Sequence, residues 1–395
     1  MKLNRWSILP FLLLTLACGL PFGASPAATL PPAPATEAPA QAAPALDPTA
    51  PALPPLDAPI VEQPQFMSIH MFDALNGWGL TDAAVLRTDD GGAAWRDVTP
   101  PAGDFGYIAG SAFLDASHAF IAAPDVTDPM HMGVLYRTAD GGRTWSMNAI
   151  PFGGGSLRFI DPSNGWAMAG LGVGAGSNAI AIFQTTDGGA TWTQAFVNDP
   201  TAAGAREDIP LGGLKGVFEA RDMQTAWVGG IVYSNAAFYL YRSDDGGRSW
   251  AQVSAALPPA AQEAQVNIEE MQFPTPRDGF LSLSFTGATG ITRALFVTRD
   301  GGDNWTMMPT LFPGGRSTDF VSATDGFLFD GARFHVTRDA GATWTIVEPD
   351  LVFDEAFMDM DFVDTTTGWV IASDPSTFVI RLYKSVDGGA TWELQ

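Results

Sequence analysis

The octamer TTDGGATW, residues 185–192, recurs with small changes along the chain. Seven copies keep the aspartate and the final tryptophan, and Ala340 replaces a glycine in one of them. A repeat at intervals of about fifty residues is typical of a propeller or a solenoid. The repeated residues are Asp90, Asp140, Asp187, Asp245, Asp300, Asp339, Asp387, Trp95, Trp145, Trp192, Trp250, Trp305, Trp344 and Trp392.

A second pattern precedes most octamers. It reads NGWGL at 76–80, NGWAM at 164–168 and TGWVI at 367–371, and HAFIA at 118–122 is a degenerate copy. Each copy follows a short apolar stretch, and the apolar spacing of helices is missing. One unit therefore reads as four antiparallel strands, with the octamer in the turn between the third and the fourth. We predict an all-β fold, a single seven-bladed β-propeller over residues 65–395.

The residue types of the octamer suit a rigid turn. An aspartate can accept hydrogen bonds from the backbone of its own turn, and glycine permits a positive φ. The tryptophan would pack on a neighbouring sheet, which contributes on the order of a few kcal/mol. Because seven active sites in one chain would be unexpected, we interpret the octamer residues as structural and predict no catalytic residue among them.

Composition excludes several classes of function. The chain has 20 Lys and Arg against 43 Asp and Glu, a net charge of −23, which would repel nucleic acid. Cys18 is the only cysteine, and the four histidines (His70, His118, His131 and His335) are scattered without ligand spacing. We therefore predict no metal and no cofactor, and we expect a monomer.

The N-terminal segment indicates export. Residues 1–17 combine a basic start with an apolar run too short to span a bilayer comfortably, as in a signal peptide. LTLAC resembles a bacterial lipoprotein processing site, which implies that Cys18 is the lipid-modified first residue of the mature chain. An ordinary signal peptide is the alternative. We expect an extracytoplasmic protein, anchored to the membrane by its lipid or otherwise secreted.

Residues 18–64 are rich in proline and alanine. Proline interrupts regular ladders, and alanine buries little area, so we predict a disordered linker. A proline-rich ligand for a binding domain is the alternative.

The octamer resembles the Asp-box, or BNR, repeat. Together with the GW pattern over residues 66–395, it resembles the photosystem II assembly and stability factors. That resemblance implies a non-catalytic scaffold that binds proteins or assembles complexes in the cell envelope. In fold, the chain is also similar to sialidases, xyloglucan-cleaving glycoside hydrolases and the sortilin ectodomain. A glycan-acting hydrolase is therefore the alternative function.

Arginine usage bears on that alternative, because sialidases clamp a carboxylate with three arginines. Most arginines here lie beside or inside an octamer, which leaves few for the opposite face of a propeller. We therefore expect no enzymatic activity. The arginines at the octamers are Arg87, Arg137, Arg242, Arg299 and Arg338, and those left are notably Arg158, Arg206 and Arg316.

Candidate binding residues come from the first strand of each unit. Seven residues before the aromatic residue of the second pattern lies an apolar residue, such as Phe159 or Phe362; in the fourth unit a two-residue insertion is needed to reach Phe218. The residues next to these apolar positions, whose side chains point to the other side of the strand, are polar or small. This alternation predicts a hydrated central channel. Solvated lining without a ligand is the alternative. The candidate channel or partner-binding residues are Arg158, Lys215, Glu270, Asp319, Asp359 and Asp361, with Arg206 from the long loop 198–213.

Overall fold

The computed structural model describes residues 56–101, 110–128, 130–287, 290–374 and 376–395. The predicted signal peptide, Cys18 and the linker up to residue 55 lie outside the described residues. Strands dominate the described part, which also has two short 3-10 turns, η1 (Pro259–Ala261) and η2 (Asp354–Ala356). Within these ranges, no helix has the length and apolar character needed to cross a membrane.

Five sheets have four antiparallel strands each. The first sheet holds β1 (Ser68–Met71), β2 (Gly77–Leu80), β3 (Val85–Thr88) and β4 (Arg96–Asp97). The second holds β5 (Gly110–Phe113), β6 (Ala119–Pro124), β7 (Gly133–Thr138) and β8 (Ser146–Ile150). The third holds β9 (Ser156–Phe159), β10 (Gly165–Gly174), β11 (Ser177–Thr185) and β12 (Thr193–Val197). The last two hold β21 (Ser317–Phe320), β22 (Gly326–Phe329), β23 (Phe334–Thr337) and β24 (Thr345–Val347), and β25 (Phe357–Phe362), β26 (Gly368–Ser373), β27 (Ile380–Ser385) and β28 (Glu393–Leu394).

A larger sheet of eight strands lies between the third sheet and β21 in the chain. It consists of two runs of four strands, joined where β14 pairs with β17 at Ile231–Asn267 and Asn235–Gln265. The predicted all-β class with four-stranded antiparallel sheets is confirmed. The strands of the larger sheet are β13 (Leu214–Ala220), β14 (Ala226–Asn235), β15 (Leu240–Ser243), β16 (Ala251–Gln252), β17 (Gln265–Gln272), β18 (Gly279–Gly287), β19 (Gly290–Thr298) and β20 (Thr306–Pro313).

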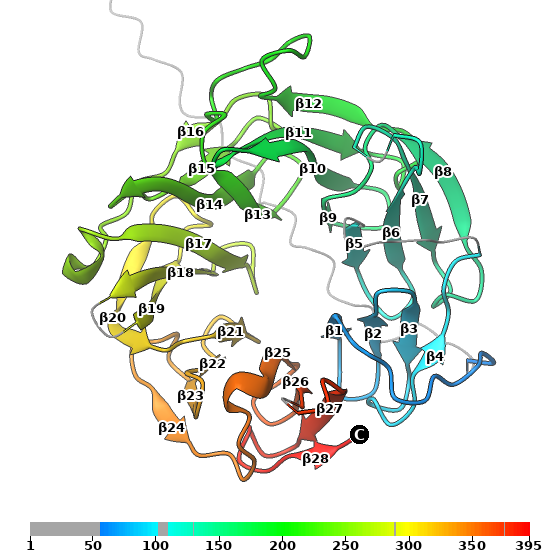
Figure 1. Ribbon diagram of the computed structural model, residues 1–395, viewed down its shortest axis with the longest axis vertical. Helices are drawn as coiled ribbons and strands as arrows, with labels where there is room; N and C mark the ends of the chain where they lie inside the picture. Colours follow the sequence, from blue (N-terminus) through cyan, green and yellow to red (C-terminus); the bar gives the residue numbers. More distant parts are fainter. Residues whose placement is uncertain (1–55, 102–109, 129, 288–289, 375) are drawn as a thin grey trace, which may run out of the picture. The chain divides into compact units, whose positions relative to one another are not determined.

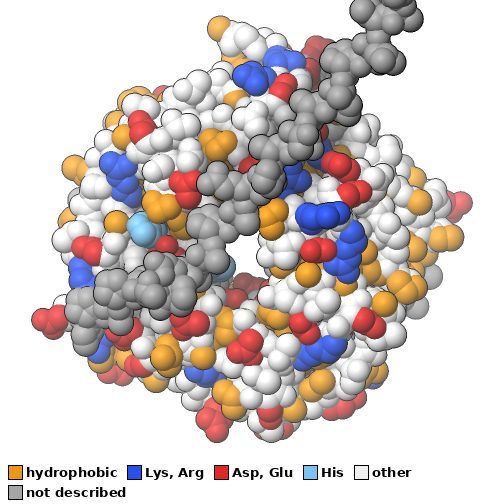
Figure 2. Space-filling model, turned by 180° about the vertical axis from the view of Figure 1, so that it is seen from behind, with side chains coloured by type: hydrophobic (Ala, Val, Ile, Leu, Met, Phe, Trp, Pro, Cys, Tyr) orange, Lys and Arg blue, Asp and Glu red, His pale blue; other side chains and the backbone are white. Residues whose placement is uncertain are grey.

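The sheets of the described part are arranged in a circle. The first strand of each run of four lies nearest the centre, namely β1, β5, β9, β13, β17, β21 and β25 (Figure 1). Because successive strands are antiparallel, every octamer turn lies at the same end of the strands as the turn between first and second strands. We call this end the octamer face. The connections between sheets and the turns between second and third strands lie at the opposite end, the loop face. Figure 2 shows a central opening, with charged and apolar side chains around it.

The octamer at residues 243–250 shows how the aspartate closes its turn. Asp245 Oδ1 accepts hydrogen bonds from Ser249 N and Ser243 Oγ (both 2.9 Å), and its Oδ2 accepts one from Ser249 Oγ (2.6 Å). Gly246 and Gly247 have φ values of 76° and 78°, which glycine adopts without strain. The same pattern of bonds recurs at Asp140, Asp187, Asp339 and Asp387.

Aromatic side chains hold neighbouring sheets together. At most junctions, the aromatic residue of a second strand lies against the aromatic residue of the next sheet's first strand, and both are largely removed from water. Stacked rings of this kind contribute beyond the area that they bury. The most closely stacked pairs are Phe120–Phe159, Phe280–Phe320 and Phe327–Phe362, with ring centroids 3.5, 3.5 and 3.7 Å apart.

The circle closes by direct packing of the first sheet against the last. Nε1 of the fully buried Trp369 donates to the carbonyl oxygen of Gly91 (3.0 Å). Met71 N donates to Asp361 Oδ2 (2.6 Å). Residues of both sheets share one hydrophobic cluster, which includes Phe66, Ile69, Leu86, Trp95, Trp369, Ile371 and Leu382.

Residues 56–64 correct the predicted boundary between linker and folded part. Leu56 is buried in the hydrophobic cluster that contains Trp78. Val61 N donates to the carbonyl oxygen of Trp95 (2.8 Å), and Ile60 forms an antiparallel bridge with Arg96 at the outer edge of the first sheet. The apolar side chains of this short stretch find a surface to bury against despite its prolines. The folded part therefore includes Leu56 and does not begin at residue 65.

Candidate functional site

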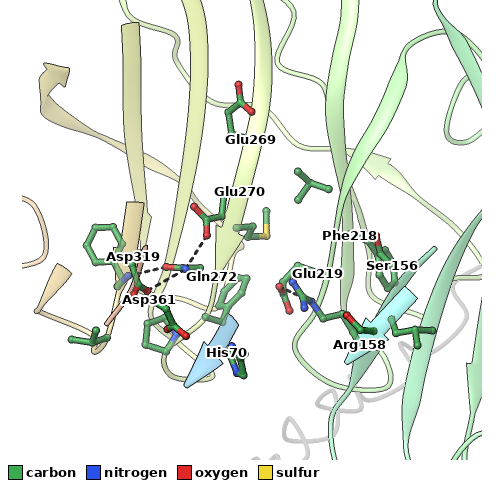
Figure 3. Close-up of a pocket in the computed structure, with 18 of the residues that line it drawn as sticks. His70, Ser156, Arg158, Phe218, Glu219, Glu269, Glu270, Gln272, Asp319 and Asp361 are labelled. Carbon is green, nitrogen blue, oxygen red and sulfur yellow. Dashed lines mark hydrogen bonds and ion pairs between the residues drawn. The ribbon is translucent and has the colours of Figure 1, made fainter. Parts of the chain in front are cut away.

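A cavity of about 670 Å³ lies among the first strands of the sheets, at the centre of the circle. Figure 3 shows its polar side chains pointing into this space from opposite sides. Its charged and polar lining residues include His70, Ser156, Arg158, Glu219, Glu269, Glu270, Gln272, Asp319 and Asp361.

The strand register explains why these side chains reach the cavity. Arg158 lies opposite Trp166, and Asp361 opposite Trp369, one residue before the position whose side chain packs between sheets. Side chains alternate along a strand, so the aromatic neighbours enter the sheet interfaces and the polar residues face the opening. The same alternation of side chains along the first strands therefore places polar residues at the opening and aromatic residues in the core.

One side of the cavity carries an acidic wall, formed by Glu270, Asp319 and Asp361. Gln272 links two of its members: Nε2 donates to Glu270 Oε1 (2.9 Å) and, in a longer bond, to Asp319 Oδ1 (3.5 Å). Thr318 Oγ1 donates to Glu270 Oε2 (2.9 Å). Hydrogen bonds thus hold Glu270 and Asp319 to neighbouring polar side chains.

The acidic wall also connects neighbouring sheets. Asp319 Oδ2 accepts a hydrogen bond from Phe362 N, and Asp361 Oδ2 accepts one from Met71 N, each of 2.6 Å. These two aspartates therefore have a structural use at their sheet junctions, in addition to facing the cavity.

Burial changes the protonation of the acidic wall. Burial raises the pKa of Glu270 to about 7; the hydrogen bond from Thr318 opposes this shift, and the charge of Asp319 adds to it. Burial, and then the charge of Asp319, raise the pKa of Asp361 well above its usual value. Burial likewise raises the pKa of Asp359. Near neutral pH the wall therefore holds protons, and a cation placed beside it would favour their release.

The opposite side of the cavity carries a basic group. Arg158 Nε pairs with Glu219 Oε2 at 3.0 Å; the arginine side chain is 48% exposed and the glutamate 14%. Burial raises the pKa of Glu219, and the charge of Arg158 opposes that shift. Burial and the charge of Arg158 lower the pKa of His70 to about 4, so His70 is neutral at physiological pH. The cavity is thus acidic on one side and of mixed charge on the other.

Lys215 does not line the cavity, contrary to the prediction. It is 5% exposed, and its Nζ donates to the carbonyl oxygens of Asn178 (2.9 Å), Leu211 (2.7 Å) and Gly213 (3.1 Å). Burial lowers its pKa to about 8. A β-bulge between Lys215 and Val217 changes the alternation of side chains, so that the lysine turns into the protein and holds the loop 198–213.

Glu219, which was not predicted from the sequence, lines the cavity at the position equivalent to Arg158. Ala220 lies opposite Ala226, as Phe159 lies opposite Gly165, so the fourth repeat needs no insertion. The constant spacing of seven residues, counted from Trp227, gives Ala220 and its neighbour Glu219. The sequence analysis took Phe218 as the equivalent of Phe159. Phe218 does pack against the preceding sheet, with its ring centroid 6.1 Å from that of Trp166.

The remaining predicted residues fall into two groups. Arg158, Glu270, Asp319 and Asp361 line the cavity, whereas Arg206 and Asp359 are not among its lining residues. Arg206, predicted as a partner-binding candidate on the loop 198–213, pairs with Asp208 (2.7 Å) and donates to the carbonyl oxygen of Arg248, and its place in partner binding stays a prediction. Asp359 acts on the cavity through its charge, which raises the pKa values of Glu270, Asp319 and Asp361.

The octamers lie on their own face, and none of their residues lines the cavity. Several of the arginines beside them connect neighbouring sheets. Arg137 Nη1 donates to the carbonyl oxygens of Asp187 (3.1 Å) and Gly188 (2.8 Å) in the next octamer, and Arg242 pairs with Asp303. In the described ranges, no cluster of three or more His, Cys, Asp or Glu could hold a metal ion.

Comparison with known proteins places this geometry among β-propellers. No family model matches the chain. The photosystem II assembly lipoprotein Ycf48 of Synechococcus sp. (strain CC9902) is 24% identical over 291 residues, which cover 66% of this chain and 80% of that relative. The solved structure of YCF48 bound to D1 peptide has a TM-score of 0.50 and 16% identity, and the match covers 85% of this chain and 99% of that one.

A glycan-active enzyme is also similar. A xyloglucanase of Paenibacillus sp is 24% identical over 260 residues, which cover 58% of this chain. The match covers only 24% of the length of that relative. The β-propeller fold is therefore supported, and the relatives include both an assembly factor and an enzyme.

Proposed function

We propose that this chain is an exported, non-catalytic scaffold that binds a protein partner in the cell envelope. The main support is that two cavity carboxylates also have a structural role. Asp319 and Asp361 line the cavity, and each accepts a hydrogen bond from a backbone N–H of the neighbouring sheet. A carboxylate committed to the ring is poorly placed to change position and hydrogen bonding during a reaction. The similarity to Ycf48 over most of that relative's length supports the same reading.

The proposal includes a domain organisation. The eight-stranded sheet counts as two blades, which gives a seven-bladed propeller of Asp-box repeats close to the photosystem II assembly factors. Residues 1–17 are a lipoprotein signal peptide, Cys18 carries the lipid, and a proline-rich linker separates the anchor from the propeller. The protein is then extracytoplasmic, monomeric and held at the membrane by its lipid.

Lipid attachment has a direct test. Cells that express the full chain are labelled with a radioactive or alkyne-bearing fatty acid, beside cells that express Cys18→Ser. We expect label and membrane association for the natural chain and neither for the variant. A natural chain that is exported, unlabelled and soluble would contradict the anchor and leave the scaffold proposal standing.

A glycan-acting hydrolase is the second candidate, and one observation favours it. Glu270, with a pKa raised to about 7, has the protonation that a general acid needs near neutral pH. The similarity to a xyloglucanase points to the same class.

An activity assay separates the two candidates. The purified chain is incubated with xyloglucan and with fluorogenic sialosides, beside Glu270→Gln. We expect no turnover by either protein. Turnover by the natural chain that Glu270→Gln abolishes would replace the scaffold proposal by the hydrolase.

A further inference from the structure

A second cavity of about 580 Å³ adjoins the first one, because Glu269 lines both. We call it the rim groove. It lies toward the loop face, among the starts of β19 and β25 and the connection between β20 and β21. Its lining residues are Glu269, Ser284, Ile291, Arg293, Gly314, Gly315, Arg316, Phe357 and Met358.

Unequal strand lengths create the rim groove. β17 to β20 have eight or nine residues each and β25 to β27 have six, whereas β21 to β24 have three or four. The octamer turns fix the opposite ends of these sheets at one face, so the extra length projects from the loop face. The short sheet β21–β24 therefore leaves a gap between two taller neighbours.

Apolar side chains also line the rim groove. Ile291 is 60% exposed and Met358 44% exposed, and Phe357 is buried beside Met358. Large apolar side chains left open to water in a concave site commonly mark a contact surface.

Side chains of opposite charge line the rim groove. The side chain of Arg316 is exposed, and its guanidinium has no hydrogen bond or ion pair among the described residues. Arg293, in contrast, is buried and donates to Ser282 Oγ (2.6 Å) and to the carbonyl oxygens of Gly315 and Arg316, so it supports the groove. Glu269 accepts a hydrogen bond from Ser284 Oγ and leads to the acidic wall.

We propose that the partner's binding segment is an extended peptide that lies in the rim groove, with an apolar side chain between Ile291 and Met358 and a Lys or Arg side chain directed past Glu269 toward the acidic wall. Arg316 would receive an acidic side chain or a terminal carboxylate of the same segment. This inference rests on the proposed function, since it names the chemistry of the partner.

Several physical arguments favour a peptide of this kind. An extended chain advances about 3.3 Å per residue and presents alternate side chains to opposite sides, so a few residues suffice to bridge charged and apolar subsites. Charge complementarity gives such a segment its orientation. A basic side chain would also favour the ionised form of the wall, because it would oppose the burial and the neighbouring carboxylates that raise the pKa values of Glu270 and Asp361.

The test starts from a random library of twelve-residue peptides displayed on phage and selected on the purified full chain. The enriched peptide is synthesised with a fluorophore, and its Kd is measured by anisotropy for the natural chain, Ile291→Asp, Met358→Asp and Glu269→Lys. We expect enriched peptides to combine apolar and basic residues, and each variant to weaken binding about tenfold or more, as for residues at the centre of an interface.

The matched control is Ile346→Asp. Ile346 is 49% exposed and lies on β24, the outer strand of the short sheet β21–β24. It is not among the residues that line the rim groove. We expect this variant to bind like the natural chain. All four substituted positions are exposed, and circular dichroism checks that each variant is folded.

Three outcomes overturn the inference, and they differ in what else they affect. Enriched peptides that bind Ile291→Asp and Met358→Asp as tightly as the natural chain place the site elsewhere and leave the scaffold proposal intact. Enriched peptides that are acidic and prefer Glu269→Lys reverse the assigned charge. No enriched peptide, together with turnover of xyloglucan, removes both this inference and the proposed function.

Discussion

The octamer face and the central cavity place the same chemical group, a carboxylate, in two opposite situations. Asp245 accepts three hydrogen bonds within its turn; burial would raise its pKa, but the bonds from Ser249 and Ser243 lower it to about 2. Asp361 accepts one bond, from Met71 N, and burial raises its pKa. Burial and the number of hydrogen-bond donors together decide whether a carboxylate is charged.

The two groups of carboxylates therefore give opposite dependences of stability on pH. An octamer carboxylate with a lowered pKa stabilises the fold above the unfolded pKa of about 4, and this contribution is lost as pH falls toward 2. A cavity carboxyl with a raised pKa holds its proton in the folded state, so stability is lost as pH rises from about 4 through 7.

Removal of an octamer carboxylate has the largest expected effect. We expect Asp245→Ala to lower the free energy of unfolding by about 2 kcal/mol at pH 7, because its three hydrogen bonds are lost and backbone and serine donors lose their partner. Urea unfolding measures the change. Asp82→Ala is the control, since Asp82 is exposed and has no hydrogen bond or ion pair among the described residues. Equal effects of the two changes would remove the contrast between the faces.

Neutralisation of a cavity carboxyl should act in the opposite direction. In Asp319→Asn the amide oxygen can still accept the bond from Phe362 N, while the buried charge is removed. We expect the variant to be more stable than the natural chain by about 1 kcal/mol at pH 8 and equally stable at pH 5, where the natural Asp319 is protonated. Thermal unfolding at both pH values measures this. A variant that is less stable at pH 8 would show that the carboxylate charge itself is needed.

The smallest expected effect concerns the basic side of the cavity. We expect Arg158→Gln to change stability by less than about 0.5 kcal/mol, since its partly exposed ion pair contributes little. The pKa of His70, lowered to about 4 by burial and by this arginine, should rise in the variant. An NMR titration of the histidine measures it. An unchanged pKa would mean that burial acts alone.

Much of the fold could be predicted because its causes are local. The Asp and Gly residues of each octamer determine a turn, and alternation along the first strands was enough to place Arg158, Glu270, Asp319 and Asp361 at the cavity. Repetition made these local signals unambiguous.

The rest could not be predicted because it depends on tertiary context. Lys215 turns inward because a bulge and the loop 198–213 offer carbonyl oxygens to its ammonium group. Glu219 was missed because Ala220 replaces the larger apolar residue, Met or Phe, that marks the position in other repeats. The rim groove arises from the relative lengths of neighbouring sheets, a property of no single repeat.

We propose that the octamer face stabilises the ring and that the loop face binds the partner. The most direct test titrates the phage-selected peptide, by anisotropy, against Asp245→Ala and Ile291→Asp under conditions where both are folded. We predict a natural Kd for Asp245→Ala, despite its lower stability, and a Kd raised about tenfold or more for Ile291→Asp. A folded Asp245→Ala that no longer binds, beside an Ile291→Asp that binds normally, would contradict the account.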